Sequence, residues 1–127
     1  FRHLESIDAH AADILATVPV KISRKQQQFE RELVTPLVAR RGDDDFLVRS
    51  SYFTYAPHAL PFARTLDFYR AHDHFIRLLR DPQHQYRALL APGDWLLYDN
   101  HRTLHARTAF TGARWLRGVY FDPSEAA

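Results

Sequence analysis

The sequence predicts a mainly β domain with flanking helices, and three observations lead to this fold class. The chain has 127 residues, of which 46% are apolar and 25% charged, and this suits a single domain over residues 1–127 with a sizeable core. Two stretches carry apolar residues at helical spacing. The last third consists of short apolar runs separated by turn residues, which is typical of an antiparallel β-meander.

Two helices are expected, over residues 4–18 and residues 62–80. The face of the first is formed by Leu4, Ile7, Ala11, Ile14 and Leu15, and that of the second by Leu66, Tyr69, Phe75, Ile76 and Leu79. Pro19 ends the first helix, and the pair Asp81-Pro82 ends the second, because the residue before a proline is driven out of helical geometry.

Strands are predicted on both sides of the second helix. Before it, residues 37–40 and 46–50 flank a turn at residues 41–44, while residues 20–33 are expected to be extended and residues 52–61 to form a loop. After it, the meander is expected over four segments: residues 86–90, 94–98, 103–108 and 114–121.

Composition excludes several functional classes. The absence of cysteine excludes disulfides, zinc fingers and thiol nucleophiles, and no apolar run approaches the roughly 20 residues of a membrane helix. With no secretory signal, we expect a cytoplasmic protein that does not bind membranes. Seventeen basic residues against 15 acidic ones form no basic stripe with interleaved aromatics, so no nucleic-acid partner is expected. The chain begins with Phe1 rather than Met, and we expect it to be a piece of a longer protein or a processed product.

Eight histidines are the first candidates for metal chemistry. His101 and His105 have the i, i+4 spacing of a helical zinc site, but the run lacks the glutamate of that motif and follows a turn. In a strand the two would lie about 13 Å apart and could not share one metal. His72 and His74 would point to different sides of a helix, where a solvated face is the simpler interpretation.

The last third also contains a specific signature. It consists of residues 90–95 (LAPGDW), 99–107 (DNHRTLHAR) and 110–120 (FTGARWLRGVY). This run resembles the closing motif of the γ-butyrobetaine and trimethyllysine hydroxylases, within the TauD-like Fe(II)/2-oxoglutarate dioxygenases. The resemblance is good over residues 67–122 and weaker over residues 1–20. It implies part of a double-stranded β-helix, or jelly roll, in which two histidines and one carboxylate hold iron on one side.

The resemblance assigns roles to three residues. His105 falls on the second iron histidine, and Arg114 on the arginine that grips the far carboxylate of 2-oxoglutarate, a task suited to the planar fork of a guanidinium. Tyr120 matches a tyrosine of an aromatic cage for a trimethylammonium group. In a strand, Arg114 and Tyr120 would point to one side, and Trp115 and Phe121 to the other, where the helices would cover them. Asn100 is expected to shape a turn.

One part of the family's iron site is missing from this sequence. The family places an H-x-D or H-x-E motif before the region matched here, and the run His3-Leu4-Glu5 alone fits that spacing. It lies at the start of a predicted helix, in a segment that resembles sequence following the motif. We therefore expect this chain to be a fragment that supplies one iron ligand of three and exposes strand edges and apolar surface, which favours partner chains.

The resulting expectation is an Fe(II)- and 2-oxoglutarate-dependent C–H hydroxylase of a betaine or trimethyllysine-like small molecule. The chain would act as a homo-oligomer or with a complementing N-terminal chain. Two alternatives remain open at this point. One is a non-catalytic jelly-roll module that binds a ligand without iron, and the other is a helix-plus-sheet interaction domain with His105 and Arg114 at its surface.

Overall fold

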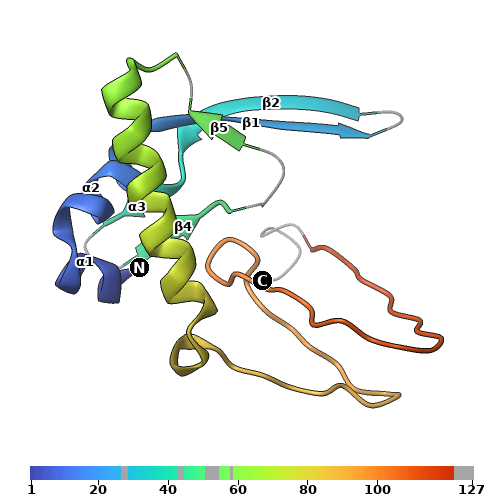
Figure 1. Ribbon diagram of the computed structural model, residues 1–127. Coiled ribbons are helices and arrows are strands. Elements are labelled where there is room, and N and C mark those ends of the chain that lie inside the picture. Colours follow the sequence, from blue (N-terminus) through green and yellow to red (C-terminus); the bar gives the residue numbers. More distant parts are fainter. Residues whose placement is uncertain (27–28, 43–44, 51–54, 58, 122–127) are drawn as a thin grey trace.

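The computed structural model describes residues 1–26, 29–42, 45–50, 55–57 and 59–121, and within them it shows two structurally different parts (Figure 1). Residues 1–84 form helices packed beside two small antiparallel sheets. Residues 85–121 follow as long stretches of chain with turns and no assigned helix or strand. These helices and sheets confirm in part the prediction of a mainly β domain with flanking helices.

The N-terminal helical stretch is broken into two helices, α1 (Arg2–Ile7) and α2 (Ala9–Thr17). Asp8 stands between them with φ −151° and ψ 78°, outside helical geometry, and its carboxylate accepts a hydrogen bond of 2.9 Å from the Ala11 N–H. Because an Asx side chain at this position satisfies an otherwise unpaired N–H of the first turn, Asp8 starts a new helix. The prediction of one continuous helix over residues 4–18 was wrong here.

A three-stranded sheet has the order β2-β1-β5, with β1 (Pro19–Gln26) in the centre. β2 (Phe29–Pro36) pairs with it antiparallel along its whole length, from Pro19 opposite Pro36 to Gln26 opposite Phe29. On the other side lies the short β5 (Tyr55–Pro57), inside the stretch predicted to be a loop. A second sheet pairs β3 (Val38–Arg41) with β4 (Asp45–Val48) and confirms the predicted hairpin.

The long helix α3 (Phe62–Arg80) has the bounds predicted from the sequence. Asp81 leaves the helix with extended backbone, and its carboxylate caps the short 3-10 helix η1 (Pro82–His84) by accepting from the Gln83 N–H at 2.9 Å. The pair Asp81-Pro82 thus ends one helix and begins the next. α3 packs along α2, and in Figure 1 α1 and α2 lie on one side of α3 while the extended C-terminal stretches lie on the other.

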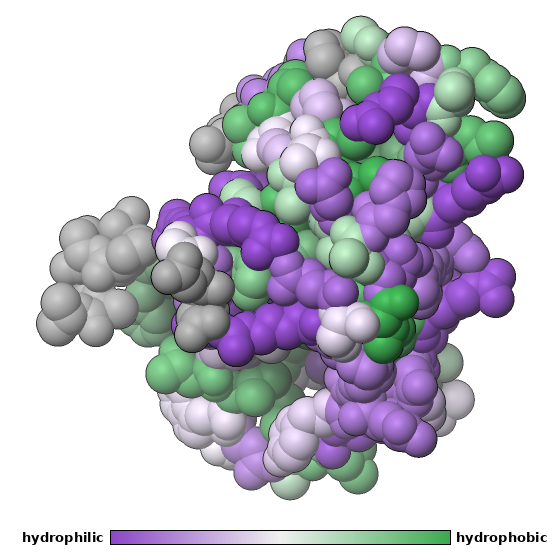
Figure 2. All heavy atoms as spheres, turned by 90° about the vertical axis from the view of Figure 1, so that its left-hand side faces the viewer, coloured by the Kyte–Doolittle hydropathy of each residue, from purple (hydrophilic) through white to green (hydrophobic). Residues whose placement is uncertain are grey.

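A single core joins the helices to the sheets. Its buried side chains come from α1, α2, β1, the start of β3 and the inner face of α3: Leu4, Ala11, Ala12, Ile14, Leu15, Val18, Val20, Leu37, Val38, Phe68, Ala71 and Phe75. The outer face of the helices is largely covered by polar side chains, with small apolar groups between them (Figure 2). From the C-terminal third, Leu104 is the residue packed against this core.

The two histidines of α3 contact different partners, as their i, i+2 spacing predicts. His72 is half-buried, its ring lies nearly parallel to that of Phe68 at 6.0 Å, and burial lowers its pKa. His74 places Nδ1 2.8 Å from Oδ2 of Asp8 and so ties α3 to the start of α2. Both side chains are partly exposed and each has a partner, so the solvated face expected for this pair is confirmed only in part.

Asp8 is therefore both the cap of α2 and the partner of His74. The Ala11 N–H first, and the His74 ring second, hold the pKa of the Asp8 carboxyl below its ordinary value. Asp8→Ala removes both interactions, and we expect the free energy of unfolding to fall by about 1–2 kcal/mol, the usual cost of a lost N-cap. Asp8→Asn is the control, since its side-chain oxygen still accepts from Ala11. Urea unfolding followed by circular dichroism measures the difference.

The lowered pKa of Asp8 also predicts how its contribution to the free energy of unfolding changes with pH. Folding favours the ionised carboxylate, so the contribution of Asp8 is present above its unfolded pKa of about 3.8 and is lost as the pH falls through the lower folded pKa. The stability difference between wild type and Asp8→Ala should accordingly shrink below pH 4. A difference that stays constant from pH 7 to pH 3 would contradict this assignment.

Candidate functional site

The three candidate site residues lie in the stretch from residue 85 to residue 121, which runs beyond the end of α3 (Figure 1). The predicted meander over residues 86–90, 94–98, 103–108 and 114–121 is absent there, since the structure assigns no strand to any of these four segments. The reason is backbone pairing: an extended segment becomes a strand only when a neighbour takes up its hydrogen bonds. Within the described residues these segments do not pair with one another as ladders.

The predicted turns between these segments are nevertheless formed. The Asp94 carboxylate accepts from the Ala91 N–H at 2.7 Å, and Gly93 between them has a φ of +95°, which glycine adopts without strain. Asp99 accepts from the His101 N–H at 2.8 Å, with Asn100 inside this turn as predicted. Gly112, with a φ of +86°, marks the last turn. The predicted turns are therefore present in this stretch, whereas the strands predicted between them are not paired.

Described contacts attach this stretch to the folded part of the chain at its start and in its middle. At the start, the Gln85 side-chain amide donates to the Leu79 carbonyl of α3 at 2.7 Å. In the middle, the Val48 N–H of β4 donates to the His101 carbonyl at 2.9 Å, and Arg102 Nε lies 3.3 Å from Asp45 Oδ1. Leu104 beside them packs against the core.

His105 is exposed and has one ring contact, with Tyr98 at 4.9 Å between ring centroids. The described residues contain no group of three histidine, cysteine or acidic side chains able to hold a metal ion. The His3-x-Glu5 pair is engaged elsewhere, since Glu5 forms an ion pair with Arg40 and the His3 ring lies 4.8 Å from that of His84. The structure thus places His105 among no further metal ligands of the described chain.

Arg114 and Tyr120 are exposed as well. The Arg114 guanidinium lies 5.7 Å from the centre of the Phe110 ring, and the Tyr120 side chain is 83% exposed. The expectation that helices would cover the opposite side of this segment was wrong, because Trp115 is 79% and Phe121 60% exposed. Neither side of residues 114–121 is buried, so the described contacts do not bring His105, Arg114 and Tyr120 together.

Ring contacts among the side chains of this region were not predicted. Tyr98 packs on His105, and Phe110 is shared by Arg114 and Arg107, whose guanidinium lies 4.3 Å from the ring centre. The sequence signals them only through the closeness of these residues along the chain.

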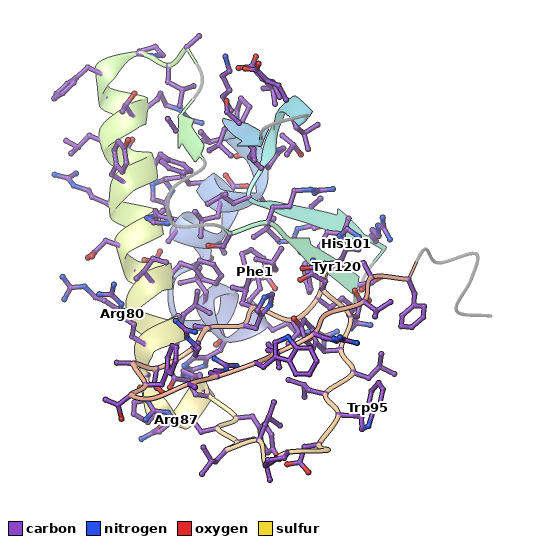
Figure 3. The ribbon with its side chains drawn as sticks, turned by 90° about the vertical axis from the view of Figure 1, so that its right-hand side faces the viewer. Phe1, Arg80, Arg87, Trp95, His101 and Tyr120 are labelled. Carbon is purple, nitrogen blue, oxygen red and sulfur yellow. The ribbon has the colours of Figure 1, made fainter. Side chains whose placement is uncertain are left out.

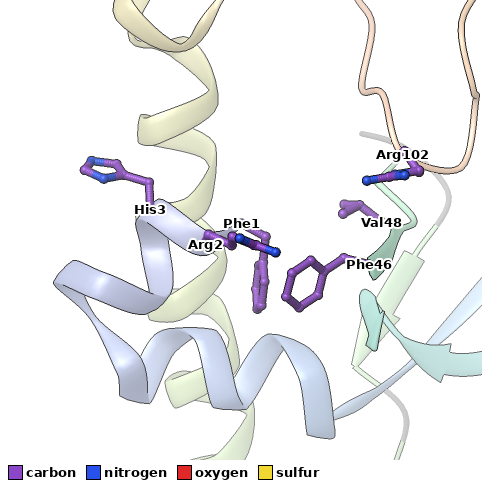
Figure 4. A pocket seen from close by; sticks show the side chains of 6 residues that line it. All are labelled: Phe1, Arg2, His3, Phe46, Val48 and Arg102. Carbon is purple, nitrogen blue, oxygen red and sulfur yellow. The ribbon is translucent and has the colours of Figure 1, made fainter. Parts of the chain in front are cut away.

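A hollow does exist in the molecule, but elsewhere. It has a volume of about 360 Å³, lies between the start of α1 and the β3–β4 sheet, and is lined by Phe1, Arg2, His3, Phe46, Val48 and Arg102 (Figure 4). None of the three candidate residues lines it. We therefore do not identify this hollow with the site that the sequence predicts.

Comparison with known proteins defines the class of protein. The family model described as "Taurine catabolism dioxygenase TauD, TfdA family" matches residues 3–120, nearly the whole chain, and this chain belongs to that family. The resemblance inferred from the C-terminal motif is confirmed. Membership of this family implies a jelly-roll fold, and the structure contains small antiparallel sheets and helices.

Individual relatives make the likeness more specific. The chain is 32% identical over 124 residues to the gamma-butyrobetaine dioxygenase of Pseudomonas sp. strain AK-1, a match covering 94% of this chain and 32% of that protein. It is 37% identical over 76 residues to the mitochondrial trimethyllysine dioxygenase of Bos taurus, covering 59% of this chain and 18% of that protein. The chain thus spans about a third, or less, of the length of these relatives.

The part of the chain described here has no helix that is both long and apolar enough to cross a membrane. Large apolar side chains of residues 86–121, Leu89 and Trp95 among them, are exposed to solvent, and Trp95 projects away from the rest of the chain (Figure 3).

This exposure gives a direct spectroscopic prediction. Trp95 is 95% and Trp115 79% exposed, and they are the two tryptophans of the chain. In dilute solution we expect acrylamide to quench the tryptophan fluorescence nearly as efficiently as it quenches free tryptophan. Trp95→Phe and Trp115→Phe assign the signal to each position. Strong shielding of both tryptophans in the dilute monomer would show that residues 85–121 pack differently from the structure.

Proposed function

We propose that this chain is the C-terminal part of the catalytic domain of an Fe(II)- and 2-oxoglutarate-dependent dioxygenase. Its reaction would be hydroxylation of a C–H bond in a betaine or trimethyllysine-like small molecule. The observation that carries the proposal is the TauD-family match over residues 3–120, which spans His105, Arg114 and Tyr120. The names of the two relatives, gamma-butyrobetaine dioxygenase and trimethyllysine dioxygenase, support the substrate class.

The donor chemistry of this chain fits one position of an iron site. A neutral imidazole suits Fe(II), and His105 is exposed, with one ring nitrogen available for a metal and the other for a supporting hydrogen bond. Three protein ligands are needed, and the described residues provide no such group. The other two ligands would come from polypeptide beyond these 127 residues. When bound, iron together with 2-oxoglutarate supplies the activation of dioxygen, and the protein supplies binding and orientation.

Arg114 would hold the carboxylate of 2-oxoglutarate that lies far from the metal. Its guanidinium stays charged at all physiological pH values and can meet a carboxylate with two parallel hydrogen bonds. In the structure it is exposed and faces an aromatic ring rather than an acidic side chain. Within the described residues it is therefore not committed to an internal ion pair.

Tyr120 would form one wall of a cage for a trimethylammonium group. Such a cation cannot donate a hydrogen bond and is held over the electron-rich faces of aromatic rings. Gly118 lies between Arg114 and Tyr120, and a side chain at this position would meet no atom within 4 Å in the present structure. In a paired strand it would leave free space on the face that carries both residues.

The polypeptide that supplies the other iron ligands would also cover the apolar side chains that residues 86–121 expose. Monomeric proteins rarely leave large contiguous apolar patches in water. Residues 86–121 expose Tyr86, Leu89, Trp95, Leu97, Trp115, Leu116, Val119 and Tyr120 by more than three-fifths each. We propose that complementing polypeptide, from the N-terminal part of the domain or from a second copy, covers this surface and supplies the missing strand partners.

The metal role of His105 is tested by His105→Ala in the full-length protein. We expect loss of iron-dependent succinate formation from 2-oxoglutarate, because one of three ligands is gone. His101→Ala is the matched control: it removes a neighbouring exposed histidine that the proposal leaves outside the iron site. Retained turnover in His105→Ala would remove this residue from the ligand set. Absence of iron binding and turnover in the unaltered protein would favour a non-catalytic ligand-binding module.

The role of Arg114 is tested by its effect on the co-substrate. Arg114→Ala should raise the 2-oxoglutarate concentration needed for half-maximal turnover by about tenfold or more, since a charge-assisted bidentate contact is lost. The measurement is the KM for 2-oxoglutarate at saturating substrate. An unchanged KM would contradict the assignment.

A further inference from the structure

The segment of residues 99–104 leads directly into the proposed metal ligand His105, and its own hydrogen bonds fix its backbone. The Asp99 carboxylate accepts from the His101 N–H at 2.8 Å. The Asp99 carbonyl accepts from the N–H groups of the third and fourth residues after it, at 3.2 Å and 2.9 Å. One residue thus closes a turn over the four that follow it, and the chain leaves this turn two residues before His105.

The same segment is also attached to the folded part of the chain. The Val48 N–H of β4 donates to the His101 carbonyl at 2.9 Å. Leu104 packs against the core and is the one residue of 86–121 that is not exposed. Alternate residues of an extended chain point to opposite sides, so Leu104 in the core turns His105 away from it. The orientation of His105 therefore depends on how this segment is seated.

An ion pair completes this attachment. Arg102 Nε lies 3.3 Å from Oδ1 of Asp45, the first residue of β4, and the two side chains are 59% and 44% exposed. Oδ1 itself is shielded from solvent and accepts no hydrogen bond from the described residues, so the Arg102 guanidinium supplies the positive charge that faces it. In Figure 4 Arg102 lies beside Val48 of the same strand.

The exposure of this pair indicates what it does. Ion pairs that are this open to water contribute little to stability, because solvent screens them. Arg102 is thus better suited to fixing a position than to stabilising the fold, and it stands three residues before His105. Residues 106–121 are all exposed, so the described contacts that orient this histidine lie on its N-terminal side, the Tyr98 ring included.

We propose that Arg102 is a positioning residue for His105. Through Asp45 it locks residues 99–104 onto the β3–β4 hairpin, and this sets where the His105 imidazole is presented to the metal. The inference rests on the proposed function, which supplies the metal role of His105, and adds to it a pair of residues for which the family resemblance supplied no role. Partners that orient a metal ligand from outside the ligand set typically change metal affinity by about tenfold or more when they are removed.

The test measures metal binding in the full-length protein, without 2-oxoglutarate or turnover. The probe is Co(II), which takes the same nitrogen and oxygen ligands as Fe(II) and whose visible absorption reports the ligands around it. The variants are Arg102→Gln, Asp45→Asn, the double variant and His105→Ala. Arg77→Gln is the matched control, because it breaks another exposed arginine–aspartate pair, with Asp73 inside α3. Urea unfolding followed by circular dichroism measures the stability of each variant.

We expect Arg102→Gln and Asp45→Asn each to weaken Co(II) binding by about tenfold and to alter its absorption. The double variant should lose no more than either single variant, since all three break the same pair. Arg77→Gln should change Co(II) binding by less than about twofold. The urea midpoints of the Arg102 and Asp45 variants should stay close to that of Arg77→Gln.

Unchanged Co(II) binding in Arg102→Gln, or losses that add in the double variant, would overturn the positioning role. A loss of binding that occurs only together with a lowered urea midpoint would overturn it as well. If His105→Ala loses Co(II) binding while Arg102→Gln retains it, the proposed function stands and the positioning role alone falls. If His105→Ala binds Co(II) as tightly as the unaltered protein, the metal role in the proposed function falls, and the positioning role falls with it.

Discussion

Every amide and carbonyl of an extended chain needs a hydrogen-bond partner, and this requirement divides the molecule in two. β1 and β2 satisfy it by pairing over eight residues each, and β3 and β4 by a hairpin. Residues 85–121 have the turns of a β-meander and one bond to β4, from Val48 to His101, but no ladder within the described chain, so the backbone groups between the turns lack strand partners. The regularity of the first part and the exposure of the second follow from the same rule.

The candidate site also lacks strand pairing, because all its residues lie within residues 85–121. A metal ligand, a carboxylate-binding arginine and a cage tyrosine act together only when a sheet fixes which side each of them faces. In the present structure His105 meets Tyr98, Arg114 meets Phe110, and Tyr120 is exposed. Pairing of residues 103–108 and 114–121 with further strands is the step that would convert these separate side chains into one pocket.

The parts that could be predicted from the sequence are those fixed by local chemistry. The bounds of α3 follow from its apolar face and from Asp81-Pro82, and the β3–β4 hairpin from its central turn. The break at Asp8 was missed because it depends on His74, 66 residues away, as well as on a cap that competes with a continuous helix. The meander was predicted from its turns, which are present, whereas strand pairing depends on neighbours that no local pattern specifies.

The family signature could be recognised from the sequence because it, too, is a local pattern. The residues that carry the signature, such as the histidines and arginines of residues 99–117, are recognised by their type and spacing, and neither depends on how the chain around them is packed. The positions of these side chains relative to one another depend on how the strands pair, and no short sequence pattern predicts that pairing. The Arg107–Phe110–Arg114 group is intermediate, since a seven-residue interval and one ring already bring two cations together without a ladder. Aromatic contacts between residues close in the sequence can therefore bring charged side chains together without a paired strand.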